Sequence, residues 1–178
     1  RAPREGDPEG DNAGGPGYWV VEGFATFIEE GRYDVEKFTW SHFNSHANSI
    51  GVVAALSKEK KLIDWEKVYK LSQVEFHGPG LAKQGIFATA DRRWGLNPQP
   101  FVEIRLFYEQ SPATCHCLYW ADGGKHRAQL LDYVTAHYTD QRDKMPISKA
   151  FGMSGAELGA MVEAFSKKVV EGWRPPKE

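Results

Sequence analysis

Apolar residues recur at the spacing of an α-helix along most of the chain between residues 18 and 173, and glycine or proline separates many of the segments. Residues three and four positions apart share one face of a helix, so this pattern predicts helices that bury one side. Helices are expected at 18–31, 44–60, 65–71, 112–120, 124–138 and 158–170. Asp64 is expected to cap the helix at 65–71, and Ser154 and Glu157 have the spacing of a capping box before 158–170. The helix at 124–138 is expected to bury one face, formed by Leu130, Leu131, Val134 and Tyr138. Residues 101–110 fit either a strand or the start of a helix. The sequence therefore predicts a mainly α architecture, with at most a minor strand element.

The two ends of the chain differ in composition from this helical part. Residues 1–17 contain glycine, proline, asparagine and charged residues, and apart from proline no apolar side chain is larger than alanine. Such a segment buries too little surface to offset the entropy lost on ordering, so we expect a flexible linker or tail. Residues 174–178 are a tail of the same kind. One helical domain over residues 18–173 remains.

The composition supports a globular core and narrows the range of partners. Of the 178 residues, 41 % are hydrophobic and 13 % aromatic, and the net charge is −2. A nearly balanced charge gives no general reason to expect a nucleic acid or an anionic membrane as partner. No apolar run approaches the roughly 20 residues that a membrane-spanning helix requires. The tryptophans, which suit either a core or an interface, are Trp19, Trp40, Trp65, Trp94, Trp120 and Trp173.

The two cysteines, Cys115 and Cys117, are separated only by His116. A disulfide between residues so close in sequence is strained, so we expect free thiols. Adjacent side chains on a helix point in different directions, which disfavours a shared metal ion. The pattern therefore predicts buried thiols on a helix, and two cysteines are too few to predict a compartment.

One carboxylate, Glu22, occupies an unusual place in the segment "YWVVEGFATFIEEG" at residues 18–31. Glu29 and Glu30 fit the polar face of this helix, whereas Glu22 has apolar neighbours on both sides. Two interpretations remain open from the residues alone. Glu22 is either an acid favoured by the helix dipole near the N-terminus, or a carboxylate that the apolar surroundings hold for a ligand.

The letters around Glu22, "WVVEGFATFIE", resemble the helix that carries the third zinc ligand in gluzincin zinc metallopeptidases, the group that includes the aminopeptidase N family. In those enzymes one helix carries H-E-x-x-H, and a second carries W-L-x-E-G-F-A, whose glutamate binds zinc. The resemblance implies that Glu22 is a zinc ligand. Zinc accepts imidazole nitrogen and carboxylate oxygen, and catalytic zinc sites keep three protein ligands and a water.

The resemblance extends, with less specific motifs, over residues 18–173. Gluzincins carry a downstream tyrosine in a pattern such as P-Y-E-K-G, and its hydroxyl supports the developing oxyanion. Here the letters "FYEQS" begin at Phe107, which implies the same catalytic role for Tyr108. A packed tyrosine with a bonded hydroxyl is the other interpretation. Residues 121–170 are similar in pattern to the helical tail of peptidase-MA-like gluzincins.

The chain departs from the family at the first zinc helix. It contains no H-E-x-x-H, and residues 1–21 contain no histidine. We expect either a longer connection, with the missing helix upstream of Arg1, or the loss of that helix. The one H-x-x-x-H pattern joins His42 to His46 and follows the Glu22 helix. Phe43 stands where the general base of H-E-x-x-H would be. The pattern fits either a pair of metal ligands or a loop that leads into a helix. Surface or capping roles are expected for His77, His126 and His137.

The resemblance thus implies the C-terminal portion of a gluzincin-type zinc metallopeptidase domain, which hydrolyses peptide bonds of a peptide or protein substrate. An upstream segment would supply H-E-x-x-H, so this chain alone is expected to bind zinc weakly or not at all and to lack protease activity. The alternative is a non-catalytic, degenerate peptidase-like helical module for protein binding or assembly. An H-E-x-x-H in the coding sequence before Arg1 would distinguish the two.

Overall fold

A computed structural model describes residues 17–34, 39–41, 43–44, 47–71, 98–139 and 146–175. The elements are α1 (Tyr18–Glu29), β1 (Arg32–Asp34), β2 (Thr39–Ser41), α2 (Asn48–Glu59), α3 (Trp65–Lys70), α6 (Pro98–Trp120), η1 (Ala121–Gly124), α7 (Arg127–Tyr138), α8 (Ile147–Phe151) and α9 (Gly155–Val170). The mainly α architecture is confirmed. Residues 1–16 and 176–178, which hold most of the two predicted tails, lie outside the described residues.

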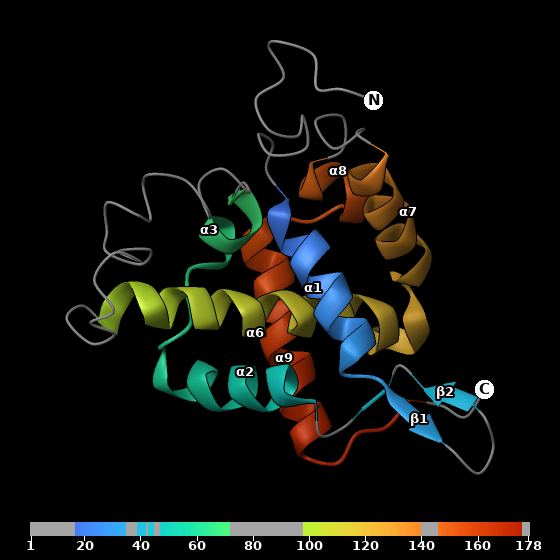
Figure 1. Ribbon diagram of the computed structural model, residues 1–178, viewed down its shortest axis with the longest axis horizontal. Coiled ribbons are helices and arrows are strands. Elements are labelled where there is room, and N and C mark those ends of the chain that lie inside the picture. The colour runs from blue at the N-terminus through green and yellow to red at the C-terminus, as the bar shows by residue number, and fades with distance from the viewer. Residues whose placement is uncertain are drawn as a thin grey trace, which may run out of the picture.

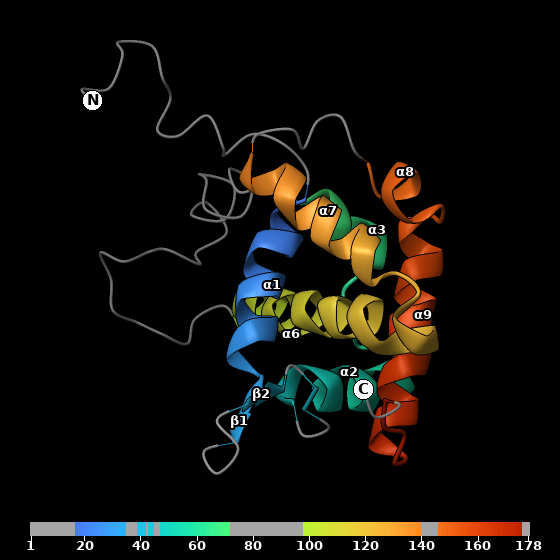
Figure 2. The same ribbon diagram turned by 90° about the vertical axis from the view of Figure 1, so that its right-hand side faces the viewer.

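Helix α6 is the axis around which the other described helices pack. Figure 1 shows it running across the centre of the molecule, with α1 crossing it and α2 beneath it. Figure 2 looks along α6 and places α1 and α9 on opposite sides of it, with α7 above and α2 below. The most extensive contact between two elements is that of α1 with α6. Residues 110–118 of α6 are consequently all buried.

The continuity of α6 corrects the sequence-based expectation for this region. Residues 101–110 are helical, and the helix continues through Pro112, which was expected in the first turn of a separate helix. Proline has no N–H to donate to the carbonyl of Tyr108, and in an exposed helix interior it costs about 3 kcal/mol. The packing of neighbouring helices around α6 therefore outweighs a strong local signal for a helix boundary.

Local capping signals, in contrast, are confirmed. The Asp64 side chain accepts a hydrogen bond from the Lys67 backbone N–H at the start of α3. Ser154 and Glu157 form a reciprocal capping box at the start of α9. Both motifs satisfy backbone donors within the same short segment, so they are readable without knowledge of the tertiary structure.

Helix α2 begins at Asn48, later than the expected residue 44, and its N-cap residue, Ala47, has no side chain that can cap it. The side chain of Asn44, which precedes this helix, donates to the backbone carbonyl of Glu30 at 2.9 Å. Between α1 and α2 lies a short antiparallel hairpin, in which β1 pairs with β2 and residue 33 lies opposite residue 40. The sequence analysis did not predict strands here, because its strand candidate, residues 101–110, is part of helix α6.

The core lies where α6 meets the surrounding helices. Its largest fully buried apolar side chains are Trp19, Phe27, Phe107, Ile50, Leu118, Leu130 and Leu158. Trp65 and Trp120 are also buried, whereas Leu131 and Tyr138, expected on the buried face of α7, are exposed. Among the described residues, no helix combines the length and the apolar character needed to cross a membrane.

Candidate functional site

Helix α1 approaches helix α6 closely at Gly23. A Cβ atom placed on Gly23 would lie 2.7 Å from the carbonyl carbon and oxygen of Ser111 and 2.9 Å from its Cβ. No residue larger than glycine fits at such distances without moving backbone, so Gly23 allows the two helices to touch. The neighbour of Gly23 in the sequence, Glu22, is thereby carried to the surface of α6. One turn before Ser111 on that helix lies Tyr108.

Glu22 receives a short hydrogen bond from its own helix. The Tyr18 hydroxyl donates to Glu22 Oε1 at 2.6 Å, and Tyr18 is 6 % exposed. Positions i and i+4 of a helix are neighbours on one face, so this bond follows from the sequence spacing once the helix forms. The Tyr18 ring stacks on Phe107 of α6, with ring centroids 5.8 Å apart and planes 12° from parallel.

Tyr108 completes the cluster from α6. It is half-buried, its ring stands edge-on to Phe107, and its hydroxyl is in hydrogen-bonding contact with Tyr18 and Glu22. The structure thus brings together Glu22 and Tyr108, the two residues that the sequence proposed for one site. It adds Tyr18, which the sequence analysis missed although its spacing from Glu22 is a readable signal. We call Tyr18, Glu22 and Tyr108 the Tyr–Glu–Tyr cluster.

The protonation of the two phenols sets what the cluster can do. Burial, followed by the nearby Glu22 carboxylate, raises the pKa of Tyr18 far above its usual value. The same two causes, in the same order, raise the pKa of Tyr108. Both phenols therefore keep their protons at neutral pH and act as hydrogen-bond donors. Each has a single proton to donate, so a proton given to Glu22 is not available to another acceptor at the same moment.

A metal ion needs more ligands than this cluster offers. The Glu22 carboxylate fits one position of a zinc shell, since a half-buried carboxylate oxygen is a ligand that zinc accepts. Within the part of the chain that the structure describes, however, no three side chains of histidine, cysteine, aspartate or glutamate lie close enough to hold a metal ion. His42 and His46, the predicted alternative pair, lie outside the described residues, as does His77.

The remaining histidines and cysteines have structural surroundings. His126 donates from Nδ1 to Gln129 Oε1 at 2.7 Å, and His137 donates from Nδ1 to the Tyr133 carbonyl at 2.8 Å. Both are buried, so the surface alternative is wrong for them. Cys115 and Cys117 are free and fully buried, as predicted, and burial raises the pKa of both thiols.

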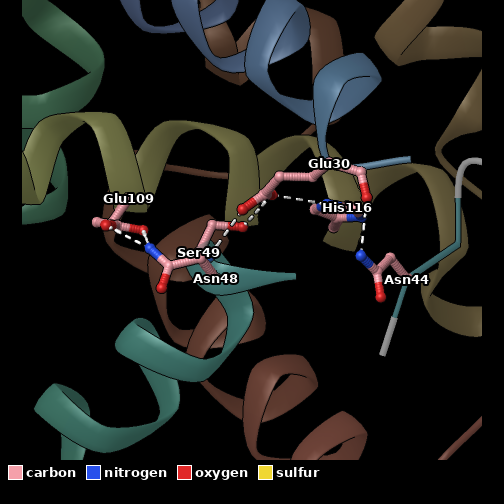
Figure 3. A network of polar contacts seen from close by, with 6 residues as sticks. All are labelled: Glu30, Asn44, Asn48, Ser49, Glu109 and His116. Carbon is pink, nitrogen blue, oxygen red and sulfur yellow. Dashed lines mark hydrogen bonds and ion pairs between the residues drawn. The ribbon is translucent and has the colours of Figure 1, made fainter. Parts of the chain in front are cut away.

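A second polar cluster lies at the other end of α1 and was not foreseen. Glu30 was assigned to the exposed polar face, but it is half-buried and its carboxylate is fully engaged (Figure 3). Its Oε1 accepts from the Ser49 backbone N–H at 2.9 Å, and its Oε2 accepts from the Ser49 hydroxyl at 2.6 Å and from His116 Nε2 at 3.0 Å. Glu30 thus provides the acceptor for the N-terminus of α2 that Ala47 lacks.

The electrostatics of this second cluster favour an ionised Glu30. Burial raises the pKa of Glu30, but the hydrogen bonds from His116 and Ser49 outweigh it and hold the pKa below its usual 4.5. His116 is fully buried on α6, and among the described residues its Nδ1 has no hydrogen-bond partner. Nearby, Asn48 donates to both oxygens of Glu109 at 2.6 and 2.8 Å, while burial and the charge of Glu30 raise the pKa of Glu109.

Two hollows of the surface lie away from the Tyr–Glu–Tyr cluster. One of about 480 Å³ lies between α2 and the end of α9, with Gly51, Val170 and Arg174 in its lining. Another of about 260 Å³ lies beside α3 and has Lys60, Trp65 and Glu163 in its lining. Neither is lined by a residue of the cluster. Comparison with protein-family models, with curated proteins and with solved structures finds no match.

Proposed function

We propose that this chain is the C-terminal portion of a gluzincin-type zinc metallopeptidase domain. In this proposal Glu22 is one zinc ligand and Tyr108 is the hydrogen-bond donor to the oxyanion formed during peptide-bond hydrolysis. The observation that supports it is the meeting of these two residues, from separate helices, in one cluster. They were selected from the sequence by separate motifs, so their proximity is not a consequence of how they were chosen.

The packing of α1 on α6 provides a physical reason for the Glu-Gly pair in the motif. Gly23 lets the two helices touch, and this contact carries the preceding carboxylate towards Tyr108. A larger residue at this position would separate the carboxylate from the phenol. The pattern E-G is therefore what a site built across these two helices requires.

The chemistry of the two residues suits the proposed roles. When bound, zinc lowers the pKa of a bound water and polarises a carbonyl group. Glu22 would contribute a carboxylate oxygen to the ion. Because burial and Glu22 raise the pKa of Tyr108, its phenol keeps its proton at neutral pH. To stabilise a negatively charged oxygen, the Tyr108 hydroxyl would turn its single proton from Glu22 to that oxygen. The other two ligands and the general base belong, in this proposal, to an H-E-x-x-H helix upstream of Arg1.

Zinc titration by calorimetry tests this proposal. We expect the 178-residue chain to bind zinc weakly or not at all, because one carboxylate falls short of the three or four protein ligands that tight zinc binding needs. The same chain extended upstream through an H-E-x-x-H should bind one zinc ion tightly. Glu22→Gln should abolish this binding, while Glu29→Gln, on an exposed position of the same helix, should leave it unchanged.

Two results would contradict the proposal. Tight one-to-one binding by the 178-residue chain, lost on replacing His42 and His46 by alanine, would make this a self-contained metal protein with its ligands elsewhere. The absence of H-E-x-x-H from the upstream coding sequence, with no zinc bound by the complete protein, would instead favour the non-catalytic module.

A further inference from the structure

Helix α2 depends on another element for the start of its first turn. Its N-cap residue, Ala47, has no side chain that can accept a hydrogen bond, and its first turn contains no acidic residue. Glu30, the residue that follows α1, accepts both from the backbone N–H and from the hydroxyl of Ser49 (Figure 3). The first N–H groups of a helix need such acceptors, and the helix dipole favours a negative charge beside them. The Glu30 carboxylate thus anchors the start of α2.

The same carboxylate is anchored to the core through His116. The imidazole Nε2 lies 3.0 Å from Glu30 Oε2, and the ring is fully buried on α6, edge-on to Phe27. An ionised carboxylate has no proton to give, so Nε2 carries the hydrogen and Nδ1 carries the lone pair. Among the described residues, Nδ1 has no hydrogen-bond partner. A further proton on His116 would therefore be a buried donor without an acceptor in this part of the chain.

The network has no favourable place for a proton on Glu30 either. The three groups that contact the carboxylate all donate to it: the backbone N–H and the hydroxyl of Ser49, and His116. If Glu30 took up a proton, the Ser49 hydroxyl could turn to accept it, but the other two donors would lose the charge that strengthens their bonds. Burial raises the pKa of Glu30, yet the bonds from His116 and Ser49 hold it below its usual 4.5, in agreement with this geometry.

Glu109, the other carboxylate at the start of α2, behaves differently. It accepts from the Asn48 side chain at 2.6 and 2.8 Å. Burial, followed by the charge of Glu30, raises its pKa, although Asn48 and the charge of Arg105 partly offset the shift. As the pH falls, Glu109 therefore takes up its proton before Glu30, and its carbonyl oxygen can still accept from Asn48. A further charge near this turn is that of Arg174 at the end of α9, which lines the same hollow as Asn48.

We propose that Glu30 is a proton-released latch on the start of α2. While Glu30 is ionised, it anchors Ser49 to α6; when it is protonated, the first turn of α2 separates from α6 and the rest of the fold stays intact. The later turns of α2 remain packed through Val53 and Ala54, which are buried in the core. The released turn carries part of the lining of the hollow of about 480 Å³ between α2 and α9, so its release reshapes that hollow. This inference does not depend on the proposed function.

Amide hydrogen exchange on the unmodified 178-residue chain tests the latch. The Ser49 N–H donates to Glu30, so its protection factor reports on the latch, whereas that of Val162, buried in α9, reports on the fold as a whole. As the pH falls below 4.5 through the lowered pKa of Glu30, we expect protection at Ser49 to fall about tenfold or more at a pH where Val162 is still protected. Loss of protection at both positions together, or protection retained at Ser49 until the protein unfolds, would overturn the proposal.

Two variants identify the group that takes up the proton. Glu30→Gln has no ionisable group at this position, so its Ser49 N–H should exchange at neutral pH as it does in the wild type in acid, with little further change on acidification. Glu109→Gln removes the other carboxylate at the start of α2 and should keep the wild-type transition at Ser49. A transition that survives in Glu30→Gln, or one that disappears in Glu109→Gln, would assign the proton to another group and refute the latch.

Discussion

At the scale of single residues, Glu22 in α1 and Glu30, the residue that follows α1, have carboxylates with different kinds of partner. Glu22 is held by phenol hydroxyls, which are weak acids and remain protonated. Glu30 is held by an imidazole, a serine hydroxyl and the N-terminus of α2, which together favour the ionised form. The partners of Glu22 are thus neutral donors, whereas those of Glu30 engage both of its oxygens.

Replacing Glu30 by glutamine should destabilise the protein. The change removes the charge that His116 and Ser49 bind. A hydrogen bond to a charged group contributes about 1.5–3 kcal/mol, so we expect the free energy of unfolding to fall by roughly 2 kcal/mol. Glu29→Gln, at the exposed neighbouring position, should change it by less than about 0.5 kcal/mol. Denaturant unfolding at neutral pH measures the free energy of unfolding of both variants. Equal losses in the two variants would show that the network does not bind Glu30.

The same network predicts a dependence on pH. The pKa of Glu30 is lower in the folded state than its usual 4.5, so its ionised form stabilises the fold at pH values above that figure. This contribution should disappear as the pH falls from about 4.5 through the lowered pKa of the folded state. The difference in stability between the wild type and Glu30→Gln should therefore be constant at neutral pH and shrink in acid. A difference that grows in acid would contradict this account.

At the scale of elements, the contact between α1 and α6 decides whether the Tyr–Glu–Tyr cluster exists. Gly23 lies against the backbone of Ser111, so the approach of the two helices is limited by main-chain atoms and not by flexible side chains. Close-packed backbones leave little room for adjustment. Adding even one methyl group at Gly23 should therefore alter both the stability of the protein and the geometry of the cluster.

Gly23→Ala and Gly51→Ala should have effects of opposite sign. The added methyl group at Gly23 must push α1 away from α6, which typically costs 1–3 kcal/mol. Gly51 is at an exposed position of α2, and a Cβ there would meet no atom within 4 Å. The higher helix propensity of alanine should therefore raise the free energy of unfolding by about 1 kcal/mol. Chemical denaturation measures both variants. A Gly23→Ala protein as stable as Gly51→Ala would show that the two helices are not in backbone contact.

Whether the sequence predicts a feature of these elements depends on how close together in the chain the interacting residues lie. The caps at Asp64 and Ser154 were predicted because donor and acceptor lie in the same turn. The helix through Pro112 was missed because the contacts that maintain it come from other helices. Glu30 and His116 were missed for the same reason, since nothing in either segment indicates that they meet. Glu22 and Tyr108 were selected through their resemblance to known motifs, and their proximity required the structure.

At the scale of the whole molecule, α6 connects the two polar clusters through one buried helix. It provides Tyr108 to the cluster at Glu22 and His116 to the network at Glu30, so the position of α1 is fixed at both ends. The described residues thus form a rigid support for one carboxylate and one phenol. Such a support is what a site needs if its remaining ligands come from another segment.

The position of a bound zinc ion relative to Glu22 tests the central claim most directly. Anomalous diffraction from a zinc-loaded crystal of the protein, extended upstream through an H-E-x-x-H, locates the ion without assumptions about its ligands. We predict one zinc ion within coordination distance of a carboxylate oxygen of Glu22. An ion bound at His42 and His46, or any site that leaves Glu22 outside coordination distance, would contradict the account.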